Sequence, residues 1–304
     1  MPDDQRIIVG LGEVLWDVFP DGKQLGGAPA NFAYISHMLG NRGTIASRLG
    51  ADALGQEARD RLDGLGIETG FLQSDPSHPT GTVRVQIDSA GQPHYQITEN
   101  VAWDVLEWTQ EWASLASRAD AVCFGSLAQR SPTSRETIGK FVTSVRPGCL
   151  RVLDVNLRQS YYSAETVRNS LQIADVVKVN HEELPTVLAM FGDVPKDLRD
   201  AAQRLRSIYG NKLVCITRGD KGSLLVAESE YNEHAGFKVT VADTVGSGDA
   251  FTAALVYHML LGSSLAAMND AANRLGAWVA SQVGATPAPD AAMLQLLRAS
   301  ASGN

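Results

Sequence analysis

Short apolar runs separated by helix-length segments dominate the chain. Runs at 6–11, 44–49, 121–124, 151–155, 176–179 and 213–217 have the length of buried strands. Between most of them, apolar residues recur at helical spacing, as at 28–39 and 55–65. Strands that alternate with helices predict a mostly parallel sheet with helices on both faces. We therefore expect an α/β, doubly wound fold that forms one domain over residues 1–304.

Two stretches follow a different pattern. Residues 80–88 alternate, with Val83, Val85 and Ile87 between polar residues, and 93–98 alternate again after a turn at 89–92. This pattern predicts a hairpin with one exposed face. Residues 13–24 also appear extended and half polar. We expect about 13–25 and 80–104 to form a small β-sheet lid; a surface hairpin without function is the alternative.

Composition narrows the class of protein. The formal net charge is −8 with no dense Lys/Arg run, which argues against a nucleic-acid partner. No apolar run approaches the roughly 18 residues of a membrane span, and the N-terminus is acidic and polar instead of resembling a signal peptide. Cys123, Cys149 and Cys215 lie in or beside apolar runs, as buried reduced thiols do. These features predict a cytoplasmic protein without a membrane partner.

Several common nucleotide and metal motifs are incomplete. In 181–185, His-Glu-Glu-Leu-Pro, proline stands where a zinc-protease helix has its second histidine. In 10–15, Gly-Leu-Gly-Glu-Val-Leu, leucine takes the third-glycine position of a dinucleotide fingerprint. There is no Walker-type loop and no protein-kinase signature. ATP, if bound, must be held by another scheme.

The most informative run is 243–249, Asp-Thr-Val-Gly-Ser-Gly-Asp. An alternating segment at 237–241 precedes it and predicts a strand, and 251–261 has a helical period. We expect a tight strand-to-helix turn with Asp249 in the first helical turn. Unpaired amides at a helix start favour an anion. The alternative is a glycine turn in which Asp249 only caps the helix.

This run strongly resembles the C-terminal signature of the ribokinase-like (PfkB-type) carbohydrate kinases, although Ser247 stands where the family more often has alanine. Segments 26–31, 102–104 and 154–158 together are most similar to the fructokinase branch. Further resemblances to the family occur in order along the chain. They are Gly12-Glu13 with Asp17, 26–31 (Gly-Gly-Ala-Pro-Ala-Asn), 102–104 (Ala-Trp-Asp), 154–158 (Asp-Val-Asn-Leu-Arg), Asn180 with Glu183, 217–222 (Thr-Arg-Gly-Asp-Lys-Gly), and Asn273 eleven residues before Gly284. The resemblance implies a three-layer α/β/α fold and an ATP-dependent sugar kinase.

The resemblance also implies residue roles. Asp249 would be the general base toward the sugar hydroxyl, and Arg158 would contact sugar or phosphate, unless it only forms a surface ion pair. The transferring phosphoryl would meet the amides of Gly246, Ser247 and Gly248. The sugar would be bound by Asp17, Gly27, Asn31, Asn156 and Asp249 and covered by Trp103. For Trp103 and Asn31, lid packing and a structural amide are the alternatives.

The remaining implied roles concern ATP and ions. The nucleotide would be held by Asn180, Thr217, Gly219, Gly222, Gly248 and Asn273. Glu183 would bind Mg²⁺ through water, although Asn180 and Glu183 can also simply start a helix. The resemblance further implies a monovalent cation, usually K⁺, near Asp243, Val245, Val279, Gln282 and Gly284.

We therefore predict transfer of the γ-phosphoryl of ATP to a sugar, with fructose as the first choice. A kinase for a pentose, another small sugar, a nucleoside or a keto-deoxy sugar acid is the enzyme alternative, and a non-catalytic sugar or nucleotide sensor is the alternative from another class. A homodimer formed through the lid is left open by the sequence.

Overall fold

A large central sheet organises the molecule. The computed structural model describes residues 5–87, 93–192 and 195–301. Its strands run in the order β13-β12-β11-β10-β9-β8-β1-β4-β5. Seven are mutually parallel, and β12 and β13 add an antiparallel edge. The bounds are β1 Ile7–Leu11, β4 Arg42–Gly50, β5 Leu72–Asp75, β8 Ala121–Gly125, β9 Leu150–Asp154, β10 Val176–Asn180, β11 Leu213–Thr217, β12 Ser223–Val226 and β13 Tyr231–His234.

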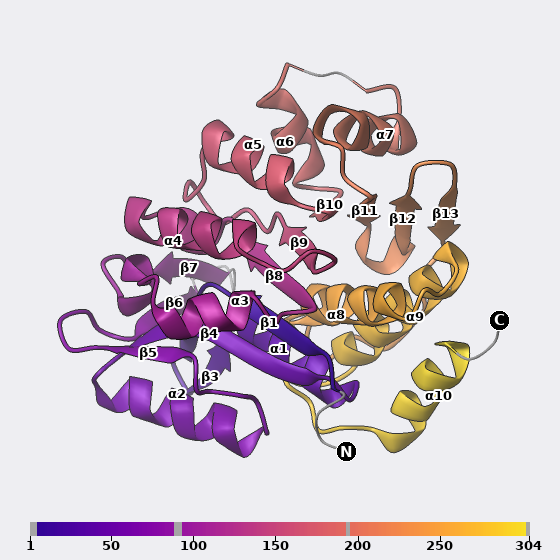
Figure 1. Cartoon of the computed structure of the whole chain (residues 1–304). Coiled ribbons are helices and arrows are strands. Elements are labelled where there is room, and N and C mark those ends of the chain that lie inside the picture. The colour runs from indigo at the N-terminus through magenta and orange to yellow at the C-terminus, as the bar shows by residue number, and fades with distance from the viewer. Residues whose placement is uncertain (1–4, 88–92, 193–194, 302–304) are drawn as a thin grey trace.

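Helices cover both faces of this sheet (Figure 1). One layer holds α3 Gln110–Ala116, α4 Pro132–Thr143, α5 Ala164–Ile173, α6 Leu184–Ala189 and α7 Leu198–Tyr209; the other holds α1 Ala28–Met38, α2 Ala53–Gly64, α8 Ser247–Leu260, α9 Leu265–Ala280 and α10 Ala291–Ala301. Alternate strand residues feed two separate apolar cores, so that in β10 Val177 and Val179 pack toward the first layer and Val176 toward the second. The predicted doubly wound, three-layer α/β/α fold is confirmed.

A second, four-stranded sheet has the order β3-β2-β6-β7. Its strands are β2 Leu15–Phe19, β3 Gly22–Gly26, β6 Gly81–Ile87 and β7 Pro93–Ile97. Antiparallel pairing joins β2 to β3 and β6 to β7, whereas β2 and β6 pair in parallel. Segments far apart in the chain thus form one small sheet, as the alternating pattern predicts. The expected turn at 89–92 lies outside the described residues.

The strand expected at 237–241 is wrong. Strand β13 ends at His234, and the chain then runs without regular structure to α8. Val239 and Val241 are 40% and 58% exposed, so their alternation reflects no buried face. The segment is joined to the rest of the protein at its far end, where the Ala242 amide donates to the Ala280 carbonyl at 2.9 Å. The glycine run therefore connects a loop, not a strand, to α8.

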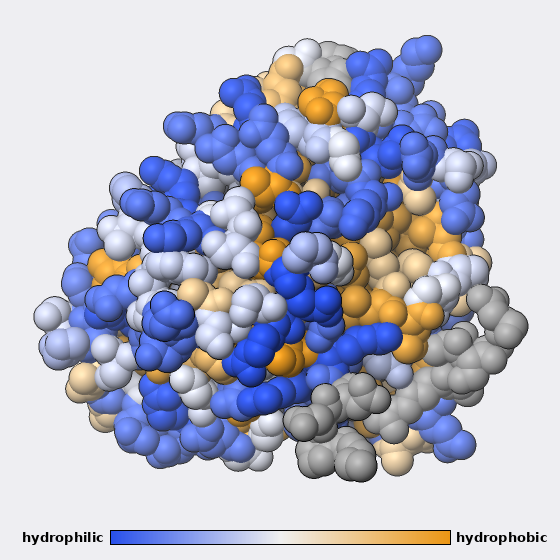
Figure 2. Space-filling model, in the orientation of Figure 1, coloured by the Kyte–Doolittle hydropathy of each residue, from blue (hydrophilic) through white to orange (hydrophobic). Residues whose placement is uncertain are grey.

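The surface and the thiols agree with the composition. Polar residues cover most of the face shown in Figure 2, and an apolar area lies over the region of α8 and α9. Cys123, Cys149 and Cys215 are free and buried, as predicted. Among the described residues, no helix combines the length and apolar character needed to span a bilayer.

Candidate active site

The predicted site residues converge at the carboxyl-terminal edge of the large sheet. Strand β1 lies between β8 and β4, so the chain leaves it toward one side through β4 and returns on the other through β8. Such a switch point opens a crevice beyond the strand ends. Helices α1 and α8 contact each other, and both begin at this edge (Figure 1). The positive ends of two helix dipoles therefore face the same crevice.

The turn before α8 needs its first glycine. Gly246 has φ 77°, and a β-carbon there would lie 2.6 Å from the β-carbon of Ala285. The Ser247 amide donates to the Thr244 carbonyl at 3.3 Å, and its hydroxyl donates to the same oxygen at 2.8 Å. Thr244 thus partly occupies one of the three amides expected to bind phosphate. Asp249 lies in the first turn of α8, as predicted.

Asp249 and Asn31 join the two signature segments directly. The Asn31 amide nitrogen donates to Oδ2 of Asp249 at 2.8 Å, across 218 residues of sequence. Burial, followed by the charge of Asp154, raises the pKa of Asp249 to about 6. The groups that oppose this rise are Asn31, Lys178 and Arg158. Asp249 is therefore a carboxylate that can accept a proton not far below neutral pH.

Two further carboxylates face the same space. Burial raises the pKa of Glu13 to about 7 and that of Asp17 to about 6, and in both cases the charge of Arg158 opposes the rise. Glu13 is 3% exposed, and its Oε2 has no hydrogen-bond partner among the described residues. The sequence reasoning assigned no role to Glu13, although a glutamate directly after a buried strand and a glycine was the available signal.

A buried ion pair under α8 was also missed. Both carboxylate oxygens of Asp154 accept hydrogen bonds from Nζ of Lys178 at 3.0 Å. The two residues are register partners on β9 and β10, and they are 4% and 7% exposed. A lysine within the apolar run 176–179 was the only sequence signal, because its partner lies on another strand.

Asn180 and Glu183 are engaged with the backbone. Oδ1 of Asn180 accepts from the amides of Glu182 and Glu183 at 2.9 and 2.8 Å. Oε1 of Glu183 accepts from the Leu157 amide at 2.9 Å, and Oε2 accepts from the Asn180 amide at 3.0 Å. The pair therefore ties the ends of β9 and β10 together. No group of three or more His, Cys, Asp or Glu suited to direct metal binding occurs in the part of the chain that the structure describes.

The expected nucleotide residues lie around β11 and β12. Thr217 ends β11, and Gly219 and Gly222 follow with φ 61° and 78°. A β-carbon on Gly222 would lie 2.0 Å from the His234 carbonyl, so this glycine is already explained by packing. The amide nitrogen of Asn273 donates to the Ser223 hydroxyl at 2.7 Å in the buried interior. Contact of these residues with ATP stays a prediction.

The expected cation residues also meet in space. Oδ1 of Asp243 accepts from the Val245 amide at 3.0 Å, and Oδ2 accepts from the Gly284 amide at 3.1 Å. The Gln282 amide donates to the Val279 carbonyl at 2.9 Å in the turn that ends α9. Segments 242–245 and 279–284 are thereby held together.

Of the expected sugar residues, one does not face the crevice. Trp103 is fully buried, and the guanidinium of Arg130 lies 4.0 Å from its ring centre. In this structure Trp103 packs below the small sheet, and its contact with a sugar stays a prediction. Asn156, by contrast, adopts φ 42° and lines a small cavity together with Asp154 and Asp249.

The family comparison decides the class of protein. Residues 8–292 match the pfkB family carbohydrate kinase over almost the whole chain. This chain belongs to that family. It is a pfkB-type kinase that takes ATP as its phosphoryl donor, and the crevice between α1 and α8 is its candidate active site.

Relatives of this pfkB kinase are similar over most of their length. A fructokinase from Vibrio alginolyticus is 30% identical over 259 residues, 81% of each chain. The crystal structure of an uncharacterized sugar kinase from Pyrococcus horikoshii in complex with ATP has a TM-score of 0.81 and 28% identity, covering 97% of this chain and 99% of that one. Fructokinase from Vibrio cholerae O395, in its fructose, ADP and calcium ion bound form, has a TM-score of 0.78 and 26% identity, covering 96% and 98%.

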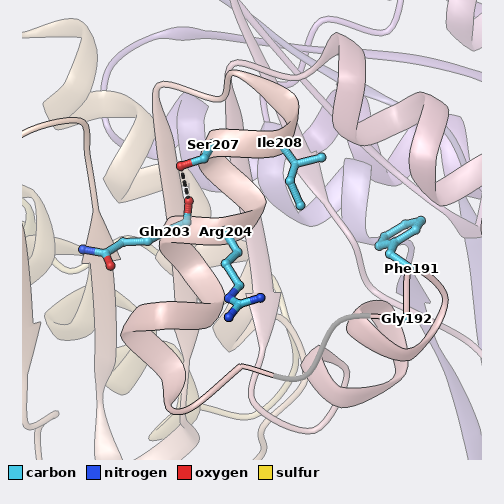
Figure 3. A pocket seen from close by; sticks show the side chains of 6 residues that line it. All are labelled: Phe191, Gly192, Gln203, Arg204, Ser207 and Ile208. Atoms are coloured by element: carbon cyan, nitrogen blue, oxygen red, sulfur yellow. Dashed lines mark hydrogen bonds between the residues drawn. The ribbon is translucent and has the colours of Figure 1, made fainter.

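Another hollow of this pfkB kinase lies away from the crevice, between α6 and α7 (Figure 3). Its lining residues are Phe191, Gly192, Gln203, Arg204, Ser207 and Ile208. The Ser207 hydroxyl donates within α7 to the Gln203 carbonyl at 2.7 Å. These six residues include no carboxylate, so this hollow offers no proton acceptor.

Proposed function

We propose that this kinase phosphorylates a neutral sugar, with fructose as the first candidate and Asp249 as the general base. The hydrogen bond of 2.8 Å between Asn31 and Asp249 carries the proposal. It places a carboxylate with a raised pKa at the start of α8, beside an amide that can also bind a sugar hydroxyl. The fructose and ADP bound by the Vibrio cholerae enzyme support a sugar and a nucleotide as ligands.

In the proposed reaction, Asp249 accepts the proton of the sugar hydroxyl. The oxygen of that hydroxyl forms a bond to the γ-phosphorus of ATP. The bond from that phosphorus to the β–γ bridging oxygen breaks, and ADP leaves. Amides at the start of α8 stabilise the charge on the equatorial oxygens. Arg158, whose charge acts on Asp249, would do the same from the loop after β9.

Two ions, magnesium and potassium, would assist phosphoryl transfer. Glu183 fits a magnesium ion held through water, because both of its oxygens accept backbone hydrogen bonds and the described residues contain no group of three or more His, Cys, Asp or Glu that would bind the ion directly. Magnesium would neutralise phosphate charge when bound. A potassium ion would lie beside Asp243, where segments 242–245 and 279–284 meet.

The charge of the crevice favours a neutral acceptor. Glu13, Asp17 and Asp249 contribute acid groups, and Arg158 is the cation that acts on all three. A keto-deoxy sugar acid would bring its own carboxylate into this field and be repelled. A nucleoside is neutral and stays the second candidate.

The first test measures ADP release from Mg-ATP with fructose, other neutral sugars, a keto-deoxy sugar acid and nucleosides. We expect turnover with fructose, and a loss of about 10²-fold or more in Asp249→Asn. The matched control is Asp200→Asn, because Asp200 occupies the same third helical position in α7. We expect the control to keep wild-type turnover.

Each other outcome has a definite meaning. Full activity of Asp249→Asn would refute its role as base. Turnover with another acceptor would keep the mechanism and correct the substrate. ATP binding without turnover on any acceptor would favour a sensor.

A further inference from the structure

The Lys178–Asp154 ion pair lies directly beneath the turn that begins α8. A β-carbon placed on Gly248 would lie 3.1 Å from Nζ of Lys178. The ammonium therefore lies in close contact with the backbone of this turn. Thr252, one helical turn later, donates to the Gly248 carbonyl at 2.9 Å, and its hydroxyl oxygen lies 3.4 Å from Oδ2 of Asp154. The pair and the first turn of α8 thus form one packed unit.

Stability alone is a poor explanation for this pair. A buried lysine and aspartate lose their hydration, and pairs of this kind often contribute no more than well-packed apolar residues of similar volume. Lys178 also interrupts a strand whose other central positions, Val176, Val177 and Val179, are apolar and fully buried. Its position is distinctive, because it brings a positive charge to the floor of the crevice where phosphate charge develops.

We propose that Lys178 is a positioning residue for phosphoryl transfer, held by Asp154 so that its ammonium supports the Gly248 turn and sets the field at Asp249. This inference rests on the proposed function. The cation and the anion of the pair act in opposite directions on the base, since Asp154 raises the pKa of Asp249 and Lys178 lowers it. The charged or titratable groups that face Asp249 are Asp154, Lys178, Arg158, Glu13 and Cys123.

Two single variants separate this role from a purely structural one. Lys178→Met removes the cation at similar volume, and Asp154→Asn keeps the cation but removes its partner. If the pair only stabilised the fold, the two variants would lose activity to the same extent. If the ammonium acts on transfer, Lys178→Met lowers kcat at least about tenfold, with the KM of ATP little changed. Asp154→Asn then retains clearly more of kcat.

The pH dependence of kcat/KM supplies a second readout. Its acidic limb reports the base of the free enzyme. Asp154→Asn should move this limb to lower pH, because an anion near Asp249 is lost. Lys178→Met should move it in the other direction. A loss of packing would reduce the amplitude of both profiles without opposite shifts.

The double variant Lys178→Met/Asp154→Asn keeps the test valid if a single variant fails to fold, because it leaves no unpaired buried charge. We expect near wild-type thermal stability and ATP binding, with kcat still reduced about tenfold. Wild-type kcat in the double variant, or equal losses of kcat in the two single variants, would overturn the inference. A fully active Asp249→Asn would instead overturn the proposed function. If Asp249→Asn is inactive while Lys178→Met and the double variant keep full activity, only this inference is overturned.

Discussion

Glu13 shows how a single buried residue couples the site to stability. Burial raises its pKa from the usual 4.5 to about 7. Between these two values the folded protein binds the proton more tightly than the unfolded chain does. The free energy of unfolding therefore falls as the pH rises through this window, and above pH 7 the buried charge destabilises the fold fully.

Replacing Glu13 by glutamine should remove this dependence. We expect Glu13→Gln to be more stable than wild type by about 3 kcal/mol at pH 8, and nearly equal to it at pH 4.5. Urea unfolding at pH 4.5, 6 and 8 measures the difference. Glu228→Gln, at an exposed position, is the control. A constant difference at all three pH values would contradict the assigned pKa shift.

For single residues, the sequence predicted those that lie in a contiguous motif and missed those whose role depends on a partner or on burial in the fold. Asp249 and Asn31 were predicted because each lies in a contiguous signature. Lys178 depends on Asp154 on a neighbouring strand. Glu13 follows a buried strand and a glycine, but the burial that raises its pKa exists only in the folded chain. For Trp103 the sequence could not distinguish a residue that faces the crevice from one that packs below the small sheet, because its burial depends on the packing of both sheets.

At the scale of elements, the loop after β9 is fastened to the lid. Nε2 of Gln159 donates to the Tyr95 carbonyl on β7 at 2.6 Å. The Tyr161 hydroxyl donates to Glu99 at 2.8 Å and lies 3.4 Å from the Ile97 carbonyl. Arg158 is carried by this same loop. A shift of β7 should therefore move the guanidinium relative to Asp249.

Tyr161→Phe tests this coupling. The change removes the hydroxyl contacts with the lid, and we expect the KM of the sugar to rise about fivefold, in line with the loss of one hydrogen bond. The KM of ATP should change little. The control is Tyr162→Phe, which removes a hydroxyl from the neighbouring residue. Equal effects on sugar and ATP would point to general damage.

The elements themselves were predictable to different degrees. Most strands of the large sheet were predictable as short apolar runs, because both of their faces are buried. Helix α2 buries one face, whereas α1 and α8 are buried nearly all round and were predictable as long apolar segments that end at a glycine. Strands β5, β12 and β13 were not identified, because runs of only four residues carry little pattern. The alternation at 237–241 was misleading for another reason: Val239 and Val241 lie at the surface, and no described strand pairs with them.

At the scale of the whole molecule, the large sheet has an apolar core on each face, whereas the small sheet ends at β7, which pairs only with β6 among the described strands. Strands with fewer partners open more easily. We expect amide hydrogens of β7 to exchange at least about tenfold faster than those of β1 and β8. Fructose with an ATP analogue should slow exchange in β7 and leave β1 unchanged. Equal exchange in both sheets would show that the lid does not open separately.

The distance along the chain between Asn31 and Asp249 has a consequence during synthesis. At about 5–20 residues per second, the 218 residues between them take on the order of 10–40 s to make. By the end of that interval the emerging protein contains all the strands β1 to β13 and the acids around Glu13, but it still lacks the carboxylate proposed to accept the proton. A chain that ends before residue 249 would have most of the scaffold but not the proposed base, and we expect such a chain not to transfer the γ-phosphoryl of ATP.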